Sequence, residues 1–345
     1  MIGAGAAPVP GAANAEPPRV SAKATTRNPM HLNSSDRSAG FNLHASTFRV
    51  WLQAARPLAQ GNIAPPLLVG QALAYAAFKE FSWSRCALAF VFGVLNQLFI
   101  VFANDVADWQ GDVLNKTYNR FSGGSRVVPE GKLSPRSLAH AALLMVALMA
   151  VFSAYLTLKL QLLWMLLLCS FAVSLLWAYS FPPFRLSYRG GGEWLQGLGL
   201  GVVLPAIGFY LQCGTLSAFP LPAFIPLFLL GYAGNIVTSL PDVPADRAAG
   251  KRSLPVRRGQ LAGRVQCLVV IAVAMAASRL VAPAASVYTL GGALLTPLLC
   301  LVWAASLVKS AEANQHGACL RFVIACGAAI TFTQLAWAFA SLSSR

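Results

Sequence analysis

Five of the six aspartates in this chain gather in two short stretches, although only 11 of its 345 residues are acidic. The first stretch, NDVADWQGD, holds Asp105, Asp108 and Asp112 at i, i+3 and i+7. The second, DVPADRAAGKR, holds Asp242 and Asp246 at i and i+4. On a helix, each spacing places its carboxylates on one side. Like charges this close need a cation between them, and Mg²⁺ takes carboxylate oxygens together with substrate phosphates. The clusters therefore predict five metal ligands that would hold Mg²⁺ on a diphosphate.

Polar and basic residues accompany both clusters. Asn104 lies on the same helix side as the first cluster, Arg126 follows that cluster, and Lys251 and Arg252 follow the second. Arginine offers a planar fork to phosphate oxygens and lysine a point charge. We expect these four residues to bind the diphosphate. The alternative, solvated loop acids paired with loop lysines, suits a single aspartate better than five of six gathered in two clusters.

The elements that must position these residues are apolar. The chain is 57% hydrophobic and 11% charged, with a mean hydropathy of +0.60, whereas soluble domains average roughly 25% charged residues. Stretches of about 20 apolar residues, enough to cross a ~30 Å hydrocarbon core, recur along the chain. They cover residues 57–78, 86–103, 137–158, 161–180, 194–212, 220–240, 265–282, 286–308 and 320–341. The sequence predicts an all-α, polytopic membrane protein with nine transmembrane helices.

The distribution of basic residues predicts the orientation in the lipid bilayer. With the N-terminus inside, the inner segments hold 21 of the 26 Lys and Arg residues and the outer segments hold five. Cytoplasmic loops carry this excess, so both Asp clusters are expected on the cytoplasmic side and the C-terminus outside. Despite the net charge of +15, the basic residues are dispersed over loops, so no nucleic-acid partner is expected.

The first 45 residues differ from the rest of the chain. They are rich in Ala, Pro, Ser and Asn and cannot bury a core, so residues 1–45 are expected to form a disordered basic cytoplasmic tail. A cleaved targeting segment is the alternative. Residues 46–345 are expected to form one nine-helix domain. The seven cysteines and four histidines show neither metal-binding nor disulfide spacing, so no cysteine or histidine site is predicted.

Taken together, NDVADWQGD and DVPADRAAGKR resemble the two Asp-rich motifs of the UbiA superfamily of intramembrane prenyltransferases, over about residues 50–341. The segments FSGGSRVVPEGKLSP, YSFPPFRLSYRGGGEWLQGLG and GKRSLPVRRG are similar to the 1,4-dihydroxy-2-naphthoate polyprenyltransferase branch of menaquinone synthesis. The resemblance implies nine helices around a central cavity, with the Asp motifs at its cytoplasmic mouth. It further implies Mg²⁺-dependent transfer of a prenyl group from a polyprenyl diphosphate to an aromatic acceptor, in a bacterial inner membrane.

An allylic cation forms when such a diphosphate departs, and aromatic faces can stabilise it by cation–π attraction. Tyr179 and Phe102 are the candidates of the predicted pocket, and Phe99 and Phe181 lie near the same level of the bilayer. For each residue, ordinary helix packing or membrane-interface placement is the alternative. Tyr179 is the strongest candidate because YSFPP directly precedes an inner loop.

Two further charged residues have open roles. Glu193, in GGGEW, either helps to bind the acceptor or is a loop acid paired with Arg189. Arg56 is either at the cavity mouth or a lipid-binding residue beside the membrane. These alternatives are left to the structure.

The acceptor also stays open, because Thr238, Ser239 and Pro241 stand where well-known members of that branch have Asn and Arg. The alternatives to dihydroxynaphthoate are 4-hydroxybenzoate, homogentisate, a tetrapyrrole or a glycerol phosphate. A membrane transporter is the alternative from another class, although transporters more often place ionisable groups near the bilayer midplane.

Overall fold

The computed structural model of the protein describes residues 39–344, and these contain helices and no β-strand. Of the predicted tail, residues 1–45, the first 38 residues lie outside the described residues. The chain divides into two units, Met1–His44 and Ala45–Arg345, and the following account concerns the second. The longer helices of the described residues are α1 (Ala39–Ala55), which begins before Ala45, and α2 (Ala64–Phe78), α3 (Trp83–Leu114), α4 (Pro135–Leu160), α5 (Met165–Ser180), α8 (Leu204–Cys213), α9 (Phe224–Ser239), α12 (Gln260–Ala276), α14 (Leu295–Leu307) and α15 (His316–Leu342).

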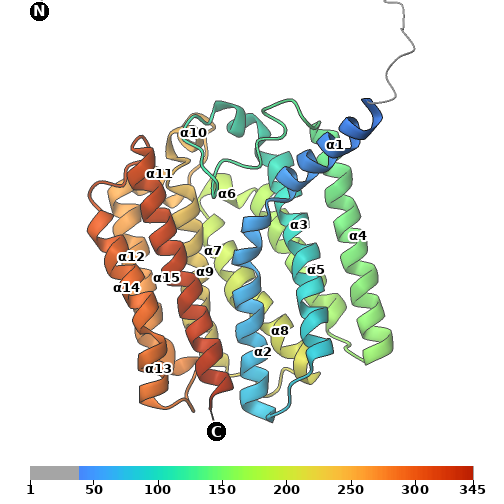
Figure 1. Ribbon diagram of the computed structural model, residues 1–345, viewed down its shortest axis with the longest axis vertical. Helices are drawn as coiled ribbons and strands as arrows, with labels where there is room; N and C mark the ends of the chain where they lie inside the picture. Colours follow the sequence, from blue (N-terminus) through green and yellow to red (C-terminus); the bar gives the residue numbers. More distant parts are fainter. Residues whose placement is uncertain (1–38, 345) are drawn as a thin grey trace, which may run out of the picture. The chain divides into compact units, whose positions relative to one another are not determined.

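Short helices complete the architecture. They are η1 (Pro57–Asn62), α6 (Leu186–Arg189), α7 (Gly192–Leu198), η2, a π-helical turn (Gly199–Val203), η3 (Leu221–Ala223), α10 (Val243–Ala248), α11 (Leu254–Arg258), η4 (Ala277–Leu280) and α13 (Val287–Ala293). Figure 1 shows α10 and α11 at the same end of the bundle as the loop that follows α3. The second Asp cluster therefore lies at that end, close to the C-terminal turns of α3.

Seven helical stretches among the described residues are long and apolar enough to cross a membrane, and the protein is an integral membrane protein. They are 83–114, 135–160, 192–213, 221–239, 260–280, 287–307 and 316–342. Two further apolar helices, α2 and α5, have only 15 and 16 residues. At 1.5 Å per residue such helices are about 23 Å long, shorter than the ~30 Å hydrocarbon core. The predicted count of nine spanning helices is therefore not confirmed.

Helix α3 carries the first Asp cluster because it continues past its apolar run. Ser82 caps its first turn by accepting a hydrogen bond from the backbone N–H of Arg85 at 3.3 Å, as N-cap serines do. The prediction ended this transmembrane segment at residue 103, whereas the helix runs on to Leu114. The extra turns hold Asp105, Asp108 and Asp112 in helical register.

The apolar core is closed by direct backbone contact between α2 and α8. A Cβ on Gly70 would lie 2.0 Å from the carbonyl oxygen of Pro205, and one on Gly208 would lie 2.2 Å from that of Leu67. Small residues permit this approach between membrane helices. On the other side, α15 packs against α2 and α14 (Figure 1). There the buried guanidinium of Arg264 donates to the carbonyls of Val308 at 2.7 Å and Ala311 at 2.6 Å, just after α14. These contacts fix the helices that surround the site.

Candidate functional site

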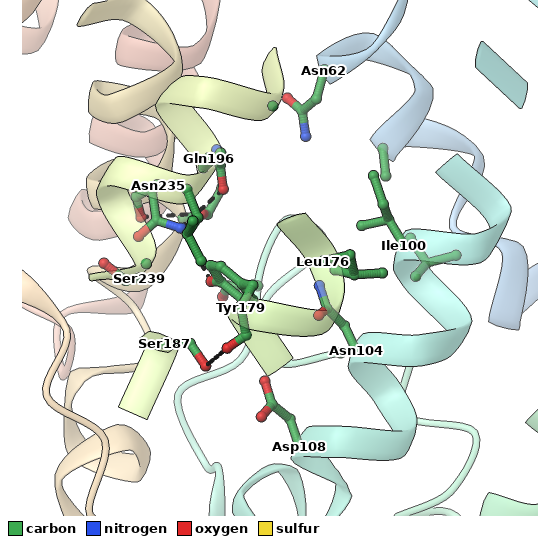
Figure 2. Close-up of a pocket in the computed structure, with 18 of the residues that line it drawn as sticks. Asn62, Ile100, Asn104, Asp108, Leu176, Tyr179, Ser187, Gln196, Asn235 and Ser239 are labelled. Carbon is green, nitrogen blue, oxygen red and sulfur yellow. Dashed lines mark hydrogen bonds between the residues drawn. The ribbon is translucent and has the colours of Figure 1, made fainter. Parts of the chain in front are cut away.

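A cavity of about 260 Å³ opens among α3, α5, α7, α9 and α10. Its polar wall contains Arg56, Asn104, Asp105, Asp108, Asp112, Asn115, Tyr179, Glu193, Asn235, Asp242, Asp246 and Lys251. Its apolar wall contains Ile100, Val101, Leu175, Leu176, Leu200 and Val203. Figure 2 shows Asn104 and Asp108 projecting from one side toward the space that Tyr179 and Asn235 face from the other. One cavity therefore joins a charged end to an apolar end.

Helix α3 lines this cavity with a single stripe. Gln97, Val101, Asn104, Asp108 and Asp112 all line it, at the three- and four-residue steps that keep side chains on one helical face. Toward the C-terminus of the helix, the stripe changes from uncharged residues to carboxylates. The side of α3 predicted from the Asp spacing is thus the cavity side.

Lys251 stands between the two acidic clusters. Its Nζ lies 2.7 Å from Oδ2 of Asp108 and 3.6 Å from Oδ1 of Asp246. Burial opposes its charge, but the two carboxylates raise the pKa of Lys251 well above its usual value. Burial raises the pKa of Asp246 to about 6, even though Lys251 acts in the opposite direction. Tyr188 donates to Oδ1 of Asp108 at 3.2 Å. The two motifs therefore meet through a shared cation.

Asp105 and Asp242 are held differently, by the loop that follows α3. The backbone N–H of Ser125 lies 3.2 Å from both oxygens of Asp105, and the Ser125 hydroxyl also donates to that carboxylate. Asp242 accepts from Nδ2 of Asn115 at 2.8 Å and from the N–H of Gly123 at 3.1 Å. The loop is thus attached to one carboxylate of each cluster.

Gly124 lets this loop lie directly on the acidic stripe. It has a φ of +70°, and a Cβ there would lie 2.2 Å from Oδ2 of Asp112 and 3.2 Å from Oδ1 of Asp105. Glycine alone adopts a positive φ without strain. Any side chain at this position would push the loop off Asp112.

Two of the predicted diphosphate ligands do not line the cavity. Arg126 donates to the backbone carbonyl of Asp112, and its guanidinium carbon lies 4.3 Å from the ring centroid of Tyr118. Arg252 is exposed, and its carbonyl accepts from Nε of Arg257 at 2.8 Å. Asn104 and Lys251 do line the cavity. The predicted diphosphate contacts of Arg126 and Arg252 remain predictions.

The aromatic candidates also separate. Tyr179 lines the cavity, and its hydroxyl accepts from Nδ2 of Asn235 at 3.1 Å. Phe102 is buried, with its ring centroid 6.0 Å from that of Trp51, outside the set of cavity residues. Phe99 is likewise buried in the core, and Phe181 packs on Trp177 at 5.0 Å. Of the four, only Tyr179 faces the cavity.

Glu193 is a cavity residue whose side chain is 1% exposed. Its Oε1 accepts from the N–H of Leu254 at 2.5 Å, and its Oε2 lies 3.8 Å from Arg257. The basic partner found in the described residues is therefore Arg257 and not Arg189, as one alternative expected. Oε2 makes no hydrogen bond within the described part of the chain. Arg56 also lines the cavity, which favours the mouth position for it.

Besides Asn115, five amides of the cavity were not predicted. They are Asn62, Asn96, Gln97, Gln196 and Asn235. Nδ2 of Asn235 donates to Oε1 of Gln196 at 2.9 Å, which joins α9 to α7. A signal existed, because polar side chains inside apolar runs such as GVLNQLF and GYAGNIV usually face a protein interior.

The donors at the charged end suit Mg²⁺ in kind. They are oxygens of carboxylates and amides, the ligands that hard cations prefer, and the acids that line the cavity outnumber Arg56 and Lys251. Among residues 39–344, no three His, Cys, Asp or Glu side chains are grouped closely enough to hold one ion by themselves. Magnesium is usually held by one or two carboxylates plus substrate phosphates. The residues therefore fit a cation that arrives with a phosphate ligand.

The bundle holds a cavity in which an acidic end adjoins an apolar wall, an arrangement that suits an intramembrane enzyme. The model of the UbiA prenyltransferase family matches residues 63–340. The chain belongs to the UbiA prenyltransferase family and is a prenyltransferase.

Known proteins similar to this chain in sequence or fold are consistent with this family. The chain is 26% identical over 229 residues to the 1,4-dihydroxy-2-naphthoate octaprenyltransferase of Mycobacterium tuberculosis, covering 66% of this chain and 76% of the relative. It is 25% identical to the enzyme of the same name from Mycobacterium leprae, covering 62% and 71%. The fold is similar to a UbiA homologue from Archaeoglobus fulgidus bound to DMAPP and Mg²⁺, with a TM-score of 0.57, 18% identity, and coverage of 86% of this chain and 99% of that one.

Proposed function

We propose that the protein transfers a polyprenyl group from its diphosphate to 1,4-dihydroxy-2-naphthoate, a step of menaquinone synthesis, and that it requires Mg²⁺. The observation that carries the proposal is the meeting of two acidic motifs at one end of a cavity with an apolar wall. Support for the acceptor comes from the names of the mycobacterial relatives. Support for the metal comes from the homologue structure bound to DMAPP and Mg²⁺.

The carboxylates proposed to hold Mg²⁺ are those of Asp108, Asp112, Asp242 and Asp246. Asp105 differs from them in its contacts with Ser125. When bound, the metal neutralises the charge that grows on the diphosphate as its bond to C1 breaks. Asn104 adds an amide beside Asp108. Lys251 supplies a cation for the departing pyrophosphate.

At the other side of the cavity, Tyr179 would place its ring near the allylic carbon and stabilise positive charge there. Because its hydroxyl is held by Asn235, the ring has a fixed orientation. The buried Oε2 of Glu193 makes no hydrogen bond among residues 39–344, so we assign it to the acceptor. In the reaction, a ring carbon of the acceptor bonds to C1, and the electrons of the C1–O bond leave with pyrophosphate. The ring regains its aromaticity by losing a proton or, from the carbon that bears the carboxylate, CO₂.

The experiment that tests this function uses membranes that contain the protein, Mg²⁺ and a labelled polyprenyl diphosphate. Each candidate acceptor is supplied in turn: dihydroxynaphthoate, 4-hydroxybenzoate and homogentisate. We expect pyrophosphate release and a lipid product with the mass of prenylated dihydroxynaphthoate, with its carboxylate or after loss of CO₂, and both signals should disappear with EDTA. A product from another acceptor would keep the prenyltransferase and change its substrate. Absence of pyrophosphate with all three acceptors would refute dihydroxynaphthoate as the acceptor.

We further propose nine transmembrane helices, with α2 and α5 crossing in addition to the seven longer stretches. The 21-to-5 distribution of basic residues supports an N-terminus and Asp motifs on the cytoplasmic side of a bacterial inner membrane, with the C-terminus outside. In this orientation the loop after α3 faces the cytoplasm, and the start of α13 faces outward.

Cysteine labelling checks this topology. In a cysteine-free background, an impermeant thiol reagent applied to intact cells should leave Lys116→Cys and Ala248→Cys unlabelled. It should label Tyr288→Cys, since Tyr288 is 92% exposed at the start of α13. Opened cells, in which all three should react, provide the control. Labelling of Lys116→Cys in intact cells would refute the proposed orientation.

A further inference from the structure

We propose that Asp105 is a positioning residue and not a ligand of the metal. It anchors the mouth loop, defined as residues 115–125, across the charged end of the cavity, and it acts through Ser125. The inference rests on the proposed function for its kinetic readouts and on geometry for the anchor itself. It separates the first cluster into one structural carboxylate and two that face the reaction.

Both carboxylate oxygens of Asp105 accept hydrogen bonds from Ser125. Both lie 3.2 Å from the N–H of Ser125, and the hydroxyl of the same serine donates to Oδ2. The residue is 4% exposed. A carboxylate that is buried and whose lone pairs are taken by protein donors has little capacity left for a cation. Asp242 also accepts two hydrogen bonds, but it is only partly buried. By contrast, no hydrogen bond reaches the Asp112 carboxylate from the described residues. Asp108 accepts from Lys251 at 2.7 Å and from Tyr188 at 3.2 Å, but it is only partly buried and lines the cavity.

Every polar group of Ser125 takes part in a hydrogen bond. Its N–H and hydroxyl bind Asp105, and its carbonyl accepts from Nε2 of Gln53 at 2.8 Å. Gln53 belongs to α1, so Ser125 is held between α1 and α3. A residue bound on three sides is a fixed point for the chain on either side of it.

Ser125 fixes the position of the loop residues that precede it. Ser122, Gly123 and Gly124 of the mouth loop line the cavity. Gly124 lies against Asp112, and the N–H of Gly123 reaches Asp242 at 3.1 Å. Release of Ser125 would therefore disturb Asp112 and Asp242 together, although neither touches Asp105 through a hydrogen bond. A loss of activity at Asp105 would resemble the loss of a ligand unless the metal and the loop are measured separately.

The experiment compares Asp105→Asn with Asp108→Asn. Asparagine at position 105 can still accept from the N–H of Ser125 and pair with its hydroxyl, but it lacks the charge that a metal needs. We expect Asp105→Asn to lower kcat by about fivefold or less and to leave the half-saturating Mg²⁺ concentration as it is in the parent. For Asp108→Asn, that concentration should rise by at least about tenfold, the scale on which metal sites lose affinity when their ligand sphere is damaged.

A second readout needs no turnover. Lys116 and Arg120 are exposed trypsin sites within the mouth loop. Asp105→Ala and Ser125→Ala should both accelerate trypsin cleavage there, and the double variant should be no faster than either single variant, because both remove the same anchor. Ser306→Ala, which removes an exposed hydroxyl on α14, is the matched control and should cleave at the parent rate.

Two outcomes overturn the proposal. A rise in half-saturating Mg²⁺ in Asp105→Asn that matches Asp108→Asn would make Asp105 a metal ligand. Unchanged cleavage in Asp105→Ala would remove it as an anchor of the loop. If the protein catalyses no prenyl transfer at all, the proposed function fails, while the cleavage rates still decide whether Asp105 holds the loop.

Discussion

Replacing Asp246 with asparagine is expected to lower turnover by roughly 10²–10⁴-fold, with folding and membrane insertion intact. A bound metal lowers the free energy of a charged transition state by several kcal/mol. Each 1.36 kcal/mol corresponds to a factor of about ten in rate. Asparagine keeps an oxygen for the 3.1 Å hydrogen bond from the Ser253 hydroxyl, so α10 should retain its place. The substitution removes the negative charge that shares Lys251 with Asp108.

The measurement is pyrophosphate release per correctly inserted molecule, over a range of Mg²⁺ concentrations. Half-saturating Mg²⁺ should rise as kcat falls. Glu312→Gln is the control for loss of one acidic charge, because Glu312 is exposed and lies outside the cavity residues. Activity of Asp246→Asn close to that of the control, in folded protein, would show that Asp246 is not part of the metal site.

Replacing Lys251 with alanine is expected to lower kcat and kcat/KM together, by roughly 10²–10³-fold, the usual loss for one electrostatic contact to a developing anion. The ammonium lies in the cavity between the clusters, where it can approach the pyrophosphate as the C1–O bond breaks. This contact is stronger in the transition state than in the ground state, so it lowers the barrier and not merely KM.

The Mg²⁺ dependence distinguishes this variant from Asp246→Asn. Lys251 competes with a metal for Asp108 and Asp246, so half-saturating Mg²⁺ should not rise in Lys251→Ala. Lys309→Ala, at an exposed lysine of the loop after α14, provides the control for loss of a basic residue. If Lys251 served only the orientation of the protein in the membrane, kcat and the KM for the prenyl diphosphate would match those of the control.

The spacing of the sequence predicted which side of α3 faces the cavity, because periodicity holds wherever a helix is continuous. The same rule explains why Phe102 fails as a pocket residue. It follows Val101 of the cavity stripe by one position, and one position turns the side chain by about 100°, here toward Trp51. The amides Gln97 and Asn235 were predictable in principle from their apolar surroundings.

The contacts of the loops could not be predicted in this way. Arg126 has a φ of +69° and turns its guanidinium to Tyr118, and no periodicity describes such a residue. The pairing of Glu193 with Arg257 joins residues far apart along the chain. Local patterns place a side chain on its own element, whereas such pairs depend on how elements from different parts of the chain come together.

The long-range contacts of α3 and the mouth loop set an order of assembly during synthesis. Asn115 bonds to Asp242, 127 residues later, and Asp108 pairs with Lys251, 143 residues later. A ribosome adding about 5–20 residues per second needs roughly 6–30 s for such a distance. Until then, the first acidic cluster lies at the membrane surface without Lys251, the partner of Asp108. The site is completed only when α9 has entered the bilayer, so a chain released before Lys251 contains the first motif without a working centre.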